Sequence, residues 1–296
     1  MKDQRRATAF GLAAVVIWST VASAFKLALR SLDTYQLLLV ATAFSLISLT
    51  VVLAWQRRLG QLIKLPAADR WRALALGILN PFIYYLVLFA AYDRLPAQVA
   101  QPINYTWALT LSWLSIPLLG QKPRLRDLLA GLVCYAGVVV IATEGDLSSF
   151  HVADPLGVGL ALFSTVLWAL FWIANTRSKV DPVVGLWWNF AGALPLILIT
   201  VIVMSDLRLP SSGALIATYV GAFEMGFTFV LWLTAMKLAK VTARVANLIF
   251  LSPFLSLILI HFVLGEHVRV ATFGGLVLIV GGLVWQQAGN RQVDVD

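Results

Sequence analysis

Charged residues are scarce in this chain: 12% of its 296 residues are Asp, Glu, Lys or Arg, whereas 60% are hydrophobic. Soluble domains carry about 25% charged and about 45–50% apolar residues. A chain with half the usual charge cannot cover its own surface in water, which excludes a soluble enzyme and a disordered chain. The single cysteine, Cys134, lies in an apolar run, so a disulfide scaffold and a cysteine-type metal site are also excluded.

Motifs for catalysis and nucleotide binding are missing as well. The sequence contains no H-E-x-x-H zinc motif, no P-loop and no G-x-S-x-G nucleophile elbow. The three histidines, His151, His261 and His267, have no metal-ligand spacing within one helix. We therefore expect a protein that is not an enzyme and has no cofactor or metal, and ATP-driven transport by this chain alone is excluded.

Long apolar runs are abundant, and ten of them approach the roughly 20 residues that a membrane-spanning helix needs. They are too continuously apolar for the alternating strands of a membrane barrel. The sequence thus predicts an all-α integral membrane protein with ten transmembrane helices. The first run resembles a signal peptide but is long enough to span, and we expect it to be uncleaved. The runs lie near residues 7–29, 35–55, 72–92, 97–119, 127–143, 154–176, 183–204, 213–236, 241–264 and 268–287.

Lys and Arg are distributed unequally over the predicted loops. Of the 22 in the chain, five fall on one side of the membrane and the remaining 17 on the side that holds both chain ends. Cytoplasmic loops carry the excess of basic residues, so both termini are predicted to be cytoplasmic. The basic residues behind the net charge of +8 thus set the orientation, and the charge does not indicate a nucleic-acid partner. The five external residues are Lys26, Arg30, Arg94, Arg208 and Arg269.

An internal repeat is indicated by glycines that recur after 144 residues. With one residue of slip, Leu119-Gly120-Gln121 also matches Leu264-Gly265-Glu266. We predict one repeat over 1–146 and a second over 147–290, followed by a cytoplasmic tail over 291–296. Each repeat holds five spans, an odd number, so the two must be inverted; inverted repeats are typical of transporters with a substrate site near the bilayer midplane. The glycine pairs are Gly77 with Gly221, Gly131 with Gly275 and Gly137 with Gly281.

Glu224 is the acidic residue placed deepest inside a predicted span. Burying an ionisable group there costs about 2.5–3.5 kcal/mol on insertion scales, and intramembrane charge usually marks a substrate or ion pathway. Asn80 occupies the matching position in the first repeat. The alternative is a protonated Glu224 that is hydrogen-bonded to a neighbouring helix.

Aromatic side chains at mid-depth provide the remaining site candidates. Tryptophan favours the membrane interface, yet Trp18, Trp107 and Trp168 lie near the centres of their spans. This predicts a cavity lined by aromatic rings; ordinary packing between helices is the alternative. The residues predicted to bind substrate, from depth and from helical spacing, are Trp18, Asn80, Tyr84, Asn104, Tyr105, Trp107, Trp168, Trp172, Glu224 and Thr228.

Ten helices, inverted five-helix halves and the L-G-[QE] ending of each half resemble the drug/metabolite transporter superfamily with its EamA repeats. The stretches Ile17-Trp18-Ser19-Thr20, Asn104-Tyr105-Thr106-Trp107 and Gly120-Gln121-Lys122 are similar to those of bacterial aromatic amino acid exporters. That group often continues the second stretch with proline, where this chain has Ala108. The resemblance implies an inner-membrane exporter with a central cavity formed by helices one, three, four, six, eight and nine.

The sequence-based interpretation is an inner-membrane, multi-pass exporter of aromatic and other neutral or apolar amino acids, working by alternating access. Its partners are the amino acid substrate and membrane lipid. Facilitated exchange and proton antiport both stay open, as does the oligomeric state, which is compatible with a monomer. Two other functions are retained: export of cationic or amphipathic drugs or metabolites, and a membrane sensor or scaffold that does not transport.

Overall fold

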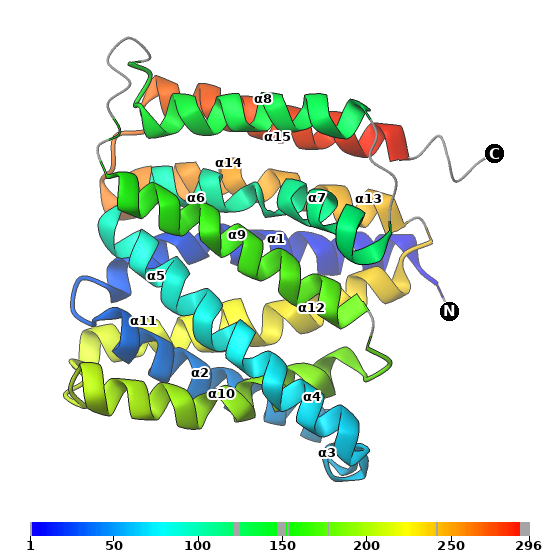
Figure 1. Ribbon diagram of the computed structural model, residues 1–296. Coiled ribbons are helices and arrows are strands. Elements are labelled where there is room, and N and C mark those ends of the chain that lie inside the picture. The colour runs from blue at the N-terminus through cyan, green and yellow to red at the C-terminus, as the bar shows by residue number, and fades with distance from the viewer. Residues whose placement is uncertain are drawn as a thin grey trace. The chain divides into compact units, whose positions relative to one another are not determined.

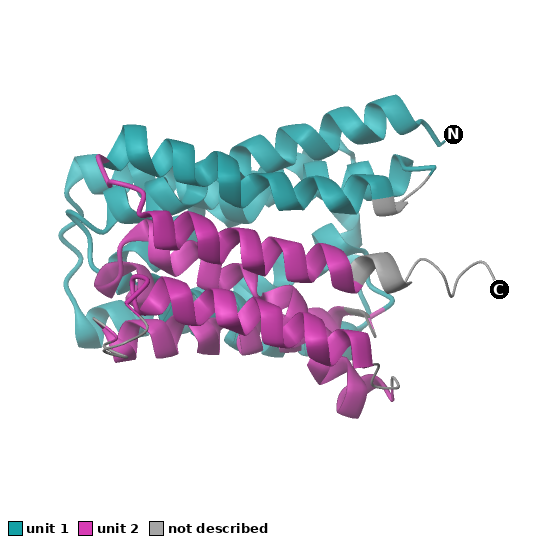
Figure 2. Cartoon of the chain, turned by 90° about the horizontal axis from the view of Figure 1, so that it is seen from above, with its two compact units in different colours: residues 1–89, 179–264 teal, residues 90–178, 265–296 magenta. Residues whose placement is uncertain are grey.

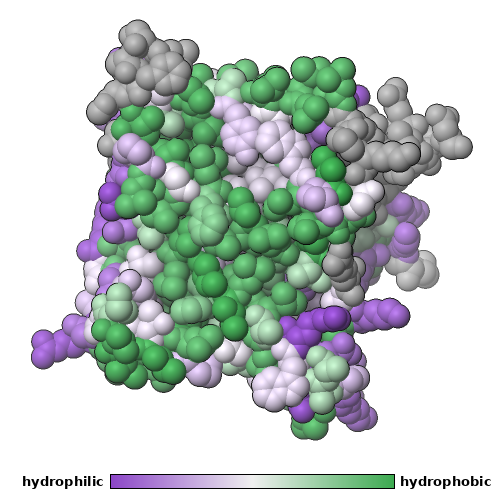
Figure 3. Space-filling view, in the orientation of Figure 1, coloured by the Kyte–Doolittle hydropathy of each residue, from purple (hydrophilic) through white to green (hydrophobic). Residues whose placement is uncertain are grey.

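The computed structural model describes residues 2–120, 125–146, 152, 154–176, 178–240 and 242–290. Over these residues the chain is helical between short connections, and eight helices are long and apolar enough to cross a membrane. Apolar residues cover much of the face seen in Figure 3. Large apolar side chains are exposed, and Ile63, Phe262 and Val270 are each about four-fifths or more exposed. Such a surface suits lipid. The predicted helical fold is confirmed over the described residues, and its eight long apolar helices are consistent with a membrane protein.

Eight of the predicted spans correspond to these long helices. They are Gln4–Ala28, Thr34–Trp55, Ala67–Arg94, Leu125–Ala142, Pro155–Asn175, Pro182–Met204, Ser211–Leu238 and Arg244–Leu264. The predicted span 97–119 is divided at Thr106 into two helices, and the predicted span 268–287 is met by a helix that starts at Val270. The count of ten and the cytoplasmic placement of the termini stay predictions. Four of the basic residues used for the orientation lie outside the described residues: Lys122, Arg124, Arg177 and Arg291. Gln121 of the repeat motif and His151 lie outside them as well.

The chain forms two compact units, each drawn from both halves of the sequence (Figure 2). Unit 1 comprises residues 1–89 and 179–264, and unit 2 comprises residues 90–178 and 265–296. Helix α5 (Tyr84–Arg94) continues from one unit into the other. These units do not correspond to the predicted repeats, 1–146 and 147–290, and the repeat boundaries stay predictions.

Unit 1 contains, in chain order, α1 (Gln4–Ala28), α2 (Thr34–Trp55), α3 (Gly60–Lys64), α4 (Ala67–Gly77), η1 (Ile78–Ile83), the start of α5, α10 (Pro182–Met204), α11 (Ser211–Tyr219), η2 (Val220–Phe227), α12 (Thr228–Leu238), α13 (Thr242–Ala246), η3 (Asn247–Leu251), α14 (Ser252–Leu259) and η4 (Ile260–Leu264). Helix α1 packs against α12 and α14, and α2 packs against α10 and η2. Figure 1 shows α2 and α10 side by side along most of their lengths.

Unit 2 contains the end of α5, then α6 (Ala97–Tyr105), α7 (Trp107–Leu119), α8 (Leu125–Ala142), α9 (Pro155–Thr176) and α15 (Val270–Asn290). Helices α8 and α15 form the most extensive pair and lie side by side (Figure 1). Helix α9 packs along both α6 and α7. A side chain on Gly137 would meet the carbonyl of Gly275, and one on Gly275 would meet the carbonyl of Gly137, so this glycine pair lets α8 and α15 approach closely.

Four helices of the chain begin at an aspartate whose carboxylate accepts hydrogen bonds from the first turn. Asp3 and Asp33 cap α1 and α2, and Asp154 and Asp181 occupy the same places before α9 and α10. An N-cap carboxylate satisfies backbone donors that the helix itself leaves unpaired. The first two helices of each half of the chain therefore start in the same way.

The third helix of each half is interrupted by wide, π-helical turns at matching places. The segment α4–η1–α5 covers residues 67–94 and α11–η2–α12 covers 211–238, an offset of 144 at both ends. The wide turns η1 and η2 end at equivalent residues, Ile83 and Phe227, and η2 begins two residues earlier in its helix than η1 does. A Cβ on Gly77 would lie 2.1 Å from the Asn189 carbonyl oxygen of α10, and a Cβ on Gly221 would lie 2.1 Å from the Ala41 carbonyl oxygen of α2. The two interrupted helices thus use equivalent glycines to approach a neighbouring backbone, which supports the predicted repeat.

The L-G-[QE] ending also has a structural role. Gly120 and Gly265 follow the ends of α7 and η4 with φ of +69° and +71°, a left-handed conformation that favours glycine. In unit 2 the Glu266 carboxylate then accepts hydrogen bonds from the backbone N–H groups of Ala97 and Gln98, at 3.0 and 3.2 Å. The acidic residue of the motif therefore caps α6.

Candidate functional site

Glu224, the central candidate from the sequence, lies in the wide turn η2 of unit 1. The Tyr85 hydroxyl of α5 donates to Glu224 Oε1 at 3.5 Å, which is long for a hydrogen bond. The second carboxyl oxygen, Oε2, is shielded from solvent and has no hydrogen-bond partner among the described residues. One oxygen of the carboxyl group therefore accepts a hydrogen bond from Tyr85, and the other accepts none from the described residues.

Two further predicted residues in unit 1 also have buried oxygen atoms without a partner in the described part of the chain. These are Oδ1 of Asn80 and Oγ1 of Thr228, and both residues are almost completely buried. Buried polar atoms are nearly always hydrogen-bonded in folded proteins, so each exception needs an explanation. A ligand that supplies hydrogen-bond donors is one such explanation.

The prediction that Asn80 and Tyr84, four residues apart, share one helix face assumes a regular helix, but the backbone at Asn80 is not helical. Its φ of −146° and ψ of 117° are extended values inside η1, just before Pro81. The four-residue spacing that places two side chains on one helix face does not hold through such a break. Tyr84 follows this break at the start of α5, where it is buried and packs edge-on against Tyr85, with ring centroids 4.7 Å apart.

Trp18 of α1 completes the predicted set in unit 1. Its ring lies 5.8 Å from that of Phe229 and 5.4 Å from that of Trp232, measured between centroids. Both partners belong to α12, so Trp18 forms an aromatic cluster between α1 and α12. Phe229 and Trp232 were absent from the predicted site because hydropathy alone does not separate them from other apolar residues.

The other five predicted residues lie in unit 2. Asn104 of α6 donates from Nδ2 to the Ser164 hydroxyl of α9 at 2.8 Å. Tyr105, which follows it, is half-buried. Trp107 begins α7 and packs edge-on against Trp168 of α9, with centroids 6.4 Å apart.

Trp168 in turn packs edge-on against Trp172, one turn further along α9, at 6.0 Å. The Trp172 indole N–H is buried and makes no hydrogen bond to the described residues. An indole at mid-depth is usually paired when buried, so this donor resembles the unpaired oxygens of unit 1. Five of the predicted residues thus lie in each unit, and their sharing of one cavity stays a prediction.

Tyr85 and Tyr219 are the contacts that sequence reasoning missed. Tyr85 is next to the predicted Tyr84, and in a helix only the packing decides which of two adjacent tyrosines faces Glu224. The Tyr219 and Thr20 hydroxyls lie 2.6 Å apart, which joins α11 to α1. The Tyr219 ring stacks on Phe223, the residue before Glu224, at a centroid distance of 4.9 Å.

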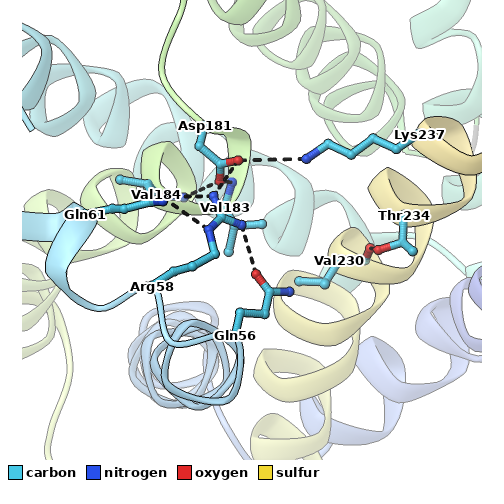
Figure 4. Close-up of polar contacts among 9 residues, drawn as sticks. All are labelled: Gln56, Arg58, Gln61, Asp181, Val183, Val184, Val230, Thr234 and Lys237. Carbon is cyan, nitrogen blue, oxygen red and sulfur yellow. Dashed lines mark hydrogen bonds and ion pairs between the residues drawn. The ribbon is translucent and has the colours of Figure 1, made fainter. Parts of the chain in front are cut away.

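Unit 1 also contains a charged cluster of Arg58, Asp181 and Lys237, which was not predicted as a site (Figure 4). Arg58 Nη2 approaches Asp181 Oδ2 to 2.7 Å, and Lys237 Nζ lies 3.8 Å from the same oxygen. Burial raises the pKa of the Asp181 carboxyl, but the hydrogen bond and charge of Arg58, the backbone hydrogen bond from Val184 and the charge of Lys237 together hold the pKa below its usual value. The cluster joins the ends of α2 and α12 to the start of α10.

Groups of three or more His, Cys, Asp or Glu that could hold a metal ion do not occur among the described residues. The chemistry available around Glu224 is therefore that of one carboxyl group, neighbouring hydroxyls and aromatic rings. Such a set binds and orients a small molecule through hydrogen bonds, charge and apolar contact.

Comparisons with known proteins agree with a transport role. A model of the EamA-like transporter family matches residues 5–143 and 155–285. The uncharacterized transporter YvbV of Bacillus subtilis is 24% identical over 73% of this chain and 72% of its own length. An uncharacterized transporter of Archaeoglobus fulgidus is 24% identical over 90% of this chain and 92% of its own. A solved crystal structure shares the fold, with a TM-score of 0.70 and 22% identity over 98% of this chain and 99% of that one.

Proposed function

This chain belongs to the EamA-like transporter family of the drug/metabolite transporter superfamily, and from that premise we propose that it exports aromatic and other neutral or apolar amino acids across the cell inner membrane. Transport proceeds by alternating access around a central, aromatic-lined cavity. The chain carries out no chemical reaction on its substrate.

The observation that carries this proposal is the surroundings of Glu224. Its Oε2 is buried and unpartnered, while aromatic rings lie beside it in the chain and around its partner Tyr85. An amino acid substrate brings an ammonium group with three N–H donors and an apolar or aromatic side chain. The carboxylate and the rings match these two parts of the substrate.

The predicted residues then have separate roles. Glu224 pairs with the substrate's ammonium, and the unpartnered oxygens of Asn80 and Thr228 accept further N–H donors. The ring clusters around Trp18 and around Trp107 with Trp168 favour apolar side chains through burial and contact with ring faces. Desolvation of the buried charges offsets much of the attraction, so binding is expected to be moderate in strength.

Export of cationic drugs or metabolites is the second candidate function, because a carboxylate with aromatic neighbours also suits an organic cation. Competition separates the two. Purified protein in liposomes preloaded with phenylalanine should take up labelled phenylalanine, and an excess of external Trp, Phe or Met should block that uptake. Blocking by a quaternary amine, with no effect of amino acids, would favour the drug exporter instead.

Coupling to protons is tested by the same liposomes with and without a pH gradient. A gradient that drives accumulation would indicate proton antiport, whereas equal rates would indicate facilitated exchange. A sensor or scaffold is the outcome if no solute in the panel is transported by protein that is folded and correctly inserted.

A further inference from the structure

The Tyr85 side chain is fixed in position before any ligand binds. It is 1% exposed, and its ring packs against Tyr84 at 4.7 Å and against Phe89 at 5.4 Å between centroids. Phe89 packs in turn against Phe25 of α1 at 4.9 Å. A ring held from two sides cannot swing its hydroxyl away without disturbing this packing.

That hydroxyl points at only one of the two carboxyl oxygens of Glu224. Tyr85 donates to Oε1, and Oε2 has no partner in the described residues although it is buried. The phenol has a single O–H to donate, so it can hold one oxygen and leaves the other. Oε1 is therefore bonded by Tyr85, whereas Oε2 is left for a ligand.

We propose that Tyr85 is a positioning residue of the substrate site, which presents Glu224 Oε2 to a primary ammonium group and so selects N–H-bearing cations over quaternary ones. This inference rests on the proposed function. A primary ammonium donates a directed, charge-assisted hydrogen bond to Oε2, whose strength depends on how the carboxylate is oriented. A quaternary ammonium has no N–H and is attracted by charge alone, which depends little on that orientation.

The inference deepens the proposed function because it names the chemical class that the site prefers. Amino acids and primary amines are favoured, and N-trimethylated compounds of similar shape are disfavoured. Glu224 is the residue that touches the substrate, and Tyr85 acts only through it. Loss of the Tyr85 hydroxyl should therefore change selectivity more than it changes binding of cations in general.

The test uses isothermal titration calorimetry of the purified full-length chain with phenylalanine and with its N-trimethyl derivative. The wild type should bind phenylalanine about tenfold more tightly than the N-trimethyl derivative, because one hydrogen bond to a charged group contributes about that much. Tyr85→Phe should bring the two affinities to within about twofold by weakening phenylalanine alone. Tyr92→Phe, which removes another buried hydroxyl from the same helix, is the matched control and should keep the preference.

A second variant covers the case in which Tyr85→Phe does not fold. Glu224→Asp shortens the side chain by one methylene and withdraws the carboxylate from Tyr85, so it should lose the preference as well. The inference would be overturned if Tyr85→Phe lost affinity for both ligands equally. It would also be overturned if either variant kept the wild-type preference for phenylalanine. Failure of the wild type to bind either ligand would overturn the proposed function instead.

Discussion

Single glycines determine how closely the interrupted helices approach their neighbours in unit 1. At Gly77 and Gly221 the space that a side chain would fill is already occupied by backbone atoms of α10 and α2. Backbone cannot move aside as the end of a flexible side chain can, so these two positions tolerate no Cβ without a shift of a helix. Their equivalence, 144 residues apart, is the residue-level support for the repeat.

Replacement of Gly221 by alanine should therefore destabilise the protein by about 1–3 kcal/mol, the usual cost of overpacking. The measurement is the midpoint of thermal unfolding in detergent, followed by tryptophan fluorescence. Gly281→Ala is the matched control, because a Cβ there meets nothing within 4 Å. Equal midpoints for the two variants would contradict the close approach of η2 to α2.

At the scale of elements, two equivalent aspartates that start α2 and α10 have different surroundings. Asp33 caps α2 in a capping box with Gln36, and the Ser205 hydroxyl also donates to it. Asp181 caps α10 and pairs with the cations of Arg58 and Lys237 (Figure 4). Asparagine can replace aspartate as a helix cap but cannot form an ion pair.

Asp181→Asn should therefore lower the free energy of unfolding by about 1 kcal/mol at neutral pH, and Asp33→Asn by clearly less. The measurement is thermal unfolding of both variants beside the wild type. Equal losses in the two variants would mean that the Arg58 contact adds nothing to the cap.

The same contact predicts a pH dependence. Because the folded pKa of Asp181 lies below its usual value, its contribution is fully present above the unfolded pKa of about 3.9 and is lost as the pH falls through the folded pKa. The difference in unfolding midpoint between the wild type and Asp181→Asn should thus shrink between pH 5 and strongly acid conditions. A difference that stays constant over that range would contradict the account.

Hydropathy could predict most helices but not the breaks within them. Lipid demands long apolar runs, so eight predicted spans coincide with helices of sufficient length. The break at Thr106 and the wide turns η1 and η2 do not end the predicted spans, because the few polar residues there, such as Asn80 and Glu224, lie within runs that stay apolar on average. They depend on packing against other helices, which a linear pattern does not contain.

The residues of the candidate site could likewise be predicted only in part. Glu224 stands out in the sequence because charge is scarce in the spans, whereas Tyr85 is indistinguishable from its neighbour Tyr84 until the helix packs. The 144-residue shift likewise detects only the later helices of the repeat. Asp3 and Asp154 differ by 151 positions and Asp33 and Asp181 by 148, so the offset changes with loop length along the chain.

At the scale of the whole molecule, the distribution of Lys and Arg predicts that both termini are cytoplasmic. A reporter that is active only in the cytoplasm, such as a fluorescent protein, should be active when it is fused to the C-terminus. A reporter that is active only after export should work when inserted in the loop around residue 146. The reverse result at either position would contradict the predicted orientation.

The central claim is that this family member moves amino acids through a site whose carboxylate is Glu224. Its most direct test is counterflow of labelled phenylalanine into liposomes that contain the purified protein and unlabelled phenylalanine. We predict uptake well above that of protein-free liposomes, and a fall to that background in Glu224→Gln, which keeps the size of the side chain but removes its charge. Uptake by Glu224→Gln equal to that of the wild type would contradict the claim.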